Sequence, residues 1–96
     1  MNSDQSSRFL VYVLECNSPH HYYVGYSAQF PLRYKKHLKG QGAAFTAKHG
    51  VGGLVDIYAV SSQTEAKQEE RELYLTWKQK PGYTVRGAGH TRSDNT

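Results

Sequence analysis

Residues 9–27 read FLVYVLECNSPHHYYVGYS, two apolar and aromatic runs separated by a turn. The run from Phe9 to Cys16 is short and rich in β-branched, aromatic and aliphatic side chains, which predicts a strand. The N-S-P sequence that follows is typical of a turn, and Tyr22 to Tyr26 predicts a second strand. Because the gap is short, the two strands should form an antiparallel hairpin. Gly25 within the second strand indicates that another chain or a ligand approaches closely there.

A short helix and a third strand are expected next. Pro31 is well placed to open a helix from about Leu32 to Lys39, since proline is favoured at the first helical position. Gly40 then provides the helix C-cap. Residues 41–53 contain four glycines and predict a loop or irregular helix. Leu54 to Val60 predicts the third strand.

A long helix follows. Ser62 and Glu65, three residues apart, form a capping box, and the helix should run to about Lys80, where Pro81-Gly82 end it. Residues 83–86 can add one short strand. The order β-β-α-β-α predicts an α+β domain with a small three-stranded antiparallel sheet flanked by helices.

Length and composition limit the domain organisation. The chain has 96 residues, enough for one domain, which we expect at residues 9–86 between a polar tail at 1–8 and a glycine-rich, polar tail at 87–96. Its net charge of +4 is compatible with a polyanionic partner. Cys16 is the single cysteine, so the chain has no internal disulfide and no structural zinc motif.

No signal peptide or membrane span is expected. The first eight residues are polar, and the longest apolar run is far below the roughly 20 residues of a membrane span. We therefore expect a cytoplasmic protein.

The long helix places one acid among apolar side chains. At 100° per residue, Ala66, Glu70, Leu73 and Trp77 fall within an arc of roughly 60° that should face the sheet. An inward carboxylate is costly unless it is paired or binds a metal ion. Glu70 is therefore either satisfied by a partner such as an arginine or part of a functional site.

Arg33 and His37 are four residues apart on the first helix and share one face. A guanidinium can hold a phosphate through two hydrogen bonds, and an imidazole can transfer a proton; a solvated surface pair is the alternative. Tyr12 and Tyr23 lie on adjacent strands, where tyrosine is also favoured for packing alone.

Together these residues resemble the GIY-YIG nuclease superfamily. The resemblance covers about Phe9 to Lys80, and each motif lies on the predicted element in the expected order. The matching motifs are Val11-Tyr12-Val13, Tyr23-Val24-Gly25, R-x-x-x-H at Arg33 and His37, and A-x-x-x-E at Ala66 and Glu70. The chain looks most like the compact single-domain members.

The resemblance implies the GIY-YIG fold and a metal-dependent endonuclease that hydrolyses phosphodiester bonds in DNA. By the same resemblance, Glu70 binds Mg²⁺ or Mn²⁺. Tyr12, with help from a neighbour such as His37, positions or deprotonates the attacking water. Arg33 neutralises charge that develops on the phosphate, and Tyr23 orients it.

DNA is thus the expected partner, with no membrane, and the oligomeric state stays open, a homodimer being one option. Backbone phosphates are expected to contact four lysines, Lys35, Lys36, Lys39 and Lys48. Many family members carry an asparagine where this chain has Thr84, and Asn95 is the only asparagine after Glu70. A catalytically weak or inactive DNA-binding module derived from the nuclease fold is therefore the alternative function.

Overall fold

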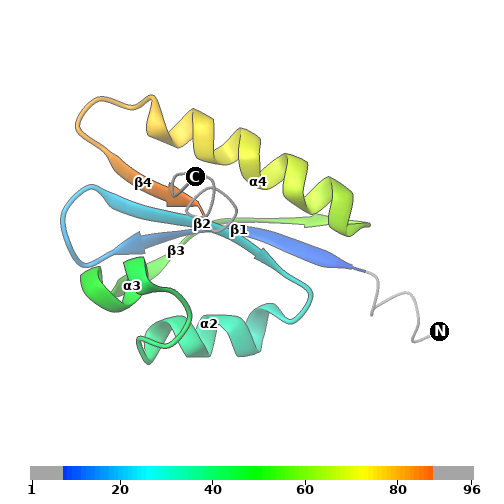
Figure 1. Ribbon diagram of the computed structural model, residues 1–96, viewed down its shortest axis with the longest axis horizontal. Coiled ribbons are helices and arrows are strands. Elements are labelled where there is room, and N and C mark those ends of the chain that lie inside the picture. The colour runs from blue at the N-terminus through cyan, green and yellow to red at the C-terminus, as the bar shows by residue number, and fades with distance from the viewer. Residues whose placement is uncertain (1–7, 88–96) are drawn as a thin grey trace.

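The computed structural model describes residues 8–87 (Figure 1). Most of the two expected tails, and with them Asn95, lie outside the described residues. Within residues 8–87, seven elements follow one another: β1 (Phe9–Cys16), β2 (His21–Ser27), α2 (Phe30–Leu38), α3 (Ala44–His49), β3 (Val51–Val60), α4 (Gln63–Lys78) and β4 (Thr84–Gly87).

The strands form one mixed sheet in the order β3-β1-β2-β4. Strand β1 is antiparallel to both β2 and β3, whereas β4 is parallel to β2. The predicted α+β class is confirmed, but the sheet has four strands rather than three and is not purely antiparallel. The short segment that sequence allowed as an extra strand is β4. It forms because it pairs with β2 from His21 to Val24 and buries Val85.

The middle of the chain is more regular than expected. Residues 44–49 form a helix, and Gly50 ends it with φ of +75°, a conformation that glycine adopts without strain. Strand β3 then begins at Val51 instead of Leu54. Two register shifts against β1 accommodate this glycine-containing start, as β-bulges commonly do.

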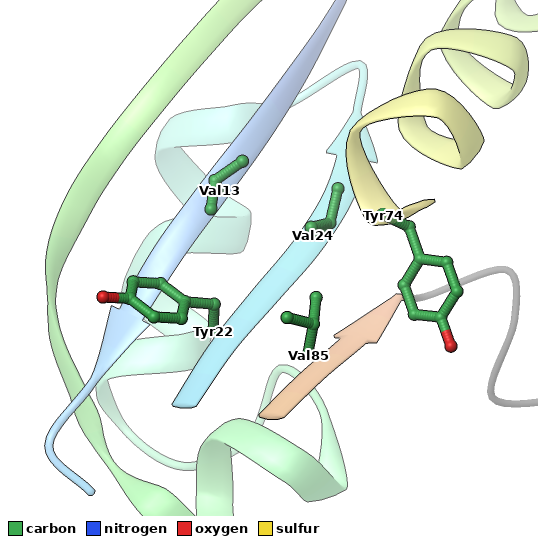
Figure 2. Packing of buried hydrophobic residues seen from close by; sticks show 5 residues of the cluster. All are labelled: Val13, Tyr22, Val24, Tyr74 and Val85. Atoms are coloured by element: carbon green, nitrogen blue, oxygen red, sulfur yellow. The ribbon is translucent and has the colours of Figure 1, made fainter. Parts of the chain in front are cut away.

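Helix α4 packs along one face of the sheet, and α2 and α3 lie on the other face (Figure 1). Under α4 lies an apolar cluster drawn from three strands and the helix: Val13, Tyr22, Val24, Tyr74 and Val85 (Figure 2). Leu73 and Trp77 pack against it. This cluster is the main core, and it fixes which side of α4 faces the sheet.

The start of α4 is capped as the sequence indicated, with one change. The Ser62 hydroxyl accepts a hydrogen bond from the Glu65 backbone N–H at 3.1 Å. The Glu65 carboxylate, however, accepts from the N–H of Ser61 at 3.0 Å rather than from that of Ser62. None of the helices within residues 8–87 has the length and apolar character needed to cross a membrane.

The opposite face carries a second cluster, which consists of Tyr12, Leu14 and Tyr23. Alternate residues of a strand point to opposite faces, so the two motif tyrosines lie on the side covered by α2 and α3. Side chains from these helices, from the loop before α3 and from the start of β3 pack against the cluster: Phe30, Tyr34, Ala43, Phe45 and Val51.

Substitution of Val13 by alanine should destabilise the fold. Val13 is fully buried in the main core, so Val13→Ala loses buried apolar surface and leaves a cavity, at a cost of about 2 kcal/mol in the free energy of unfolding. Urea denaturation measures this loss in the free energy of unfolding. The matched control is Val55→Ala, at an exposed position of β3. Equal losses in both variants would contradict the assigned core.

Candidate active site

Gly25 allows two phenols to lie over strand β2. Tyr12 on β1 is paired with Gly25 across the hairpin. A Cβ atom on Gly25 would lie 2.8 Å from Tyr12 Oη and 3.0 Å from Tyr23 Cε2. Close approach to this glycine is thus found, but the approaching groups are the side chains of the two motif tyrosines rather than another chain or a ligand.

His37 is buried beside these tyrosines. Its ring is 1% exposed, and its Nε2 lies 3.1 Å from Tyr12 Oη, within hydrogen-bond distance. The ring centroids of Tyr23 and His37 are 5.1 Å apart. The structure thus brings together the phenols of the first two motifs and the imidazole of the third, which excludes a solvated surface position for His37.

Two residues that sequence reasoning missed surround the far side of the imidazole. Thr46 Oγ1, on α3, lies 2.8 Å from His37 Nδ1 and is itself buried. A Cβ on Gly42 would lie 2.5 Å from the same nitrogen, so the backbone there packs directly on the ring. Nothing in the spacing of Thr46 and Gly42 indicated this, because their segment was expected to be a loop or irregular helix.

Arg33 lies one helical turn before His37 and is partly buried. Its positive charge and a hydrogen bond from its side chain act to lower the pKa of Tyr12. Its charge also acts to lower the pKa of Tyr23 and of His37. Among the described residues, none forms a hydrogen bond with the buried Nε of Arg33. A guanidinium in this position can bind an anion that enters beside the phenols.

Glu70 comes from α4, on the other face of the sheet, and is 2% exposed. It is buried together with Ala66, as the predicted inward stripe required. Its negative charge acts to raise the pKa of both Tyr12 and Tyr23. The carboxylate is therefore close enough to influence the two phenols electrostatically, although its helix packs on the opposite face.

Burial sets the protonation states of Tyr12, Tyr23 and His37. Burial is the main cause that raises the pKa of Tyr12 to about 12, and it also raises the pKa of Tyr23. Burial, followed by the charge of Arg33, lowers the pKa of His37 to about 4. At neutral pH both phenols are consequently protonated and the imidazole is uncharged.

The buried carboxylate of Glu70 fits a metal site in which the protein supplies few of the ligands. Within residues 8–87 no group of three or more His, Cys, Asp or Glu side chains is arranged to hold an ion. A single buried carboxylate such as Glu70 fits Mg²⁺, which retains several waters and is often held by one or two carboxylates and substrate phosphates. It does not fit a site made entirely of protein ligands.

The four lysines lie on the two helices that cover the second cluster. All of them are exposed, three on α2 or its C-cap and one on α3: Lys35, Lys36, Lys39 and Lys48. At 100° per residue, Lys35 and Lys39 lie on roughly the opposite side of α2 from His37. The side chains of Lys35 and Lys39 therefore do not face the site residues.

Thr84, at the position where an asparagine is common, begins β4 and is exposed. Its backbone N–H donates a hydrogen bond to the His20 carbonyl at 2.8 Å.

Acid should destabilise the protein through His37. The pKa of His37 is about 4 in the folded protein against 6.5 for an ordinary histidine. Between these values the unfolded chain binds a proton that the folded chain does not, so stability falls as the pH is lowered through this window. Urea denaturation at about pH 7 and about pH 5 should show a loss on the order of 1–2 kcal/mol that is smaller in His37→Gln.

The exposed His20 gives the matched control, His20→Gln. If acid destabilised His37→Gln as much as the wild type, the buried neutral imidazole would not be the cause.

Comparison with known proteins agrees with this arrangement of residues. The GIY-YIG catalytic domain model matches residues 8–84. UPF0213 protein BH0048 of Halalkalibacterium halodurans is 40% identical over 63 residues, which span 66% of this chain and 66%, or just under two thirds, of that relative. No solved structure gives a significant match. With its four motifs in order and three of them gathered around Gly25, the chain belongs to the GIY-YIG catalytic domain family, which is of the nuclease type.

Proposed function

We propose that this protein is a metal-dependent endonuclease that hydrolyses phosphodiester bonds in DNA. The observation that carries the proposal is the buried contact of 3.1 Å between Tyr12 Oη and His37 Nε2, beside the Arg33 guanidinium. A phenol, an imidazole and a guanidinium in one place supply a proton path and a charge for an anionic substrate. Packing of the core alone requires neither a proton path nor a charge at this place.

Arg33 binds the scissile phosphate in this proposal. Its buried Nε and the effect of its charge on the pKa of Tyr12, Tyr23 and His37 support this role. Negative charge grows on that phosphate as water attacks. A fixed guanidinium stabilises the transition state, because it is already oriented before the reaction.

Tyr12 orients the attacking water and takes a proton from it as it passes its own phenolic proton to His37 Nε2. In the free protein a pKa of about 12 for Tyr12 and about 4 for His37 opposes this transfer. A bound phosphodiester adds negative charge next to Arg33 and offsets part of the positive charge that lowers the pKa of His37. Substrate binding thus makes the imidazole a better base in the bound state than in the free protein.

Glu70 is the proposed ligand of the divalent ion, which is Mg²⁺ or Mn²⁺. Nucleases of this family generally use a divalent metal ion; when bound, it polarises the scissile phosphate and stabilises the leaving oxygen. Tyr23, packed against His37 and next to Tyr12, orients the phosphate.

The exposed lysines bind DNA outside the reacting centre. Because Lys35 and Lys39 lie on roughly the opposite side of α2 from His37, they contact phosphates that flank the cleaved bond rather than that bond. Such contacts set the position of the backbone without reading the bases, so they favour binding of many sequences.

A second function is a module of the same fold that binds DNA without cutting it. Thr84 in place of the usual asparagine is the observation that favours it. The two functions are separated by incubating the protein with labelled DNA, with and without Mg²⁺ or Mn²⁺. Binding without metal-dependent cleavage would support the second function.

Glu70→Gln should remove metal-dependent cleavage while the fold remains, because the amide keeps the shape of the side chain but loses the charge that holds the ion. Cleavage of labelled oligonucleotides at several Mg²⁺ and Mn²⁺ concentrations measures this. Glu72→Gln, exposed on the same helix, is the control and should behave like the wild type. Wild-type cleavage rates in Glu70→Gln would remove Glu70 from the metal site.

Arg33→Ala should lower kcat about a hundredfold or more, the scale of a lost charge stabiliser. Steady-state kinetics on one oligonucleotide measure kcat and KM separately. The control is Arg71→Ala, exposed on α4, which removes the same charge elsewhere. A rise in KM with unchanged kcat would instead assign Arg33 to substrate binding.

A further inference from the structure

The Thr46 hydroxyl lies between the imidazole of His37 and a backbone carbonyl. Its oxygen is 2.8 Å from His37 Nδ1 and 3.2 Å from the carbonyl oxygen of Ala43, to which it donates. Thr46 is 1% exposed. The proposed proton path leaves this hydroxyl without a role.

The direction of these hydrogen bonds follows from the number of protons. A hydroxyl has one proton and a carbonyl can only accept, so the bond to Ala43 uses the proton of Thr46. Toward His37 the Thr46 oxygen can then only accept, and Nδ1 must carry the imidazole proton. In a neutral imidazole this leaves Nε2 as the acceptor, and Nε2 is the atom that faces Tyr12 at 3.1 Å.

We infer that Thr46 is a positioning residue that holds His37 in the form protonated at Nδ1, so that Nε2 accepts the hydrogen bond of Tyr12. The part that this plays in catalysis rests on the proposed function. The orientation itself is a property of the free protein.

Packing alone would not select this form of the ring. Gly42 lies against the imidazole at Nδ1, Cγ and Cε1, which fixes the plane of the ring but not the site of its proton. If Thr46 were valine, the shape would be nearly kept while the acceptor disappeared. A proton on Nδ1 would then be buried without a partner, which is unfavourable, and the form protonated at Nε2 would gain population.

Long-range ¹H–¹⁵N correlation spectra of the uniformly labelled protein near neutral pH show which imidazole nitrogen carries the proton. We expect His37 to be protonated at Nδ1 in the wild type, a result that needs no variant and no activity. Thr46→Val should populate the other form and lower kcat about tenfold or more. Thr46→Ser, which restores the hydroxyl, should return His37 to the Nδ1–H form and recover most of the lost rate.

Thr76→Val is the matched control, because Thr76 is exposed on α4, and it should change neither the His37 spectrum nor the rate. A wild-type His37 protonated at Nε2, or a Thr46→Val protein that keeps the Nδ1–H form, overturns the inference. If the wild type cuts no DNA, the proposed function fails, and the spectra alone then decide whether Thr46 sets the imidazole.

Discussion

Tyr12 and Tyr23 lie over the backbone of β2 because Gly25 has no Cβ atom, and the remaining contacts of the candidate site depend on that approach. With Tyr12 in this position, its hydroxyl reaches His37 Nε2. Any side chain at position 25 would meet the Tyr12 phenol within 3 Å. The glycine of the second motif is thus required by the packing between two strands, whatever part it plays in the chemistry.

Two opposite charges act on the same pair of phenols. Arg33 favours their ionised forms and Glu70 disfavours them, while burial outweighs both and keeps the phenols protonated. The imidazole is likewise uncharged. The free protein therefore holds neutral proton carriers that are influenced by both a cation and an anion. A bound phosphate or metal ion would change this balance strongly, because solvent screening is weak among buried groups.

The elements predicted correctly from the sequence are those with a long apolar pattern or clear capping residues. The hairpin, the helix that carries Arg33 and His37, and the inward position of Glu70 follow from apolar periodicity and from capping residues. The segment of α3 was expected as a loop or irregular helix, and β4 was left as an option, because these elements have six and four residues, too few to establish a period. Thr46 could not be assigned, since its contact with His37 exists only once α3 is packed.

The carboxylate of Glu70 comes from a different part of the fold than the phenols, the guanidinium and the imidazole of the candidate site. Strands β3 and β4 are parallel and lie at opposite edges of the sheet, so α4 must cross the whole sheet to join them. Glu70 is carried near the middle of this crossing, whereas the phenols, the guanidinium and the imidazole come from the first 37 residues. A small slide of α4 along the sheet would change the distance from carboxylate to phenols and leave the Tyr12–His37 contact intact. Evolution can accordingly adjust the proposed ion binding through the packing of one helix without disturbing the proposed proton path.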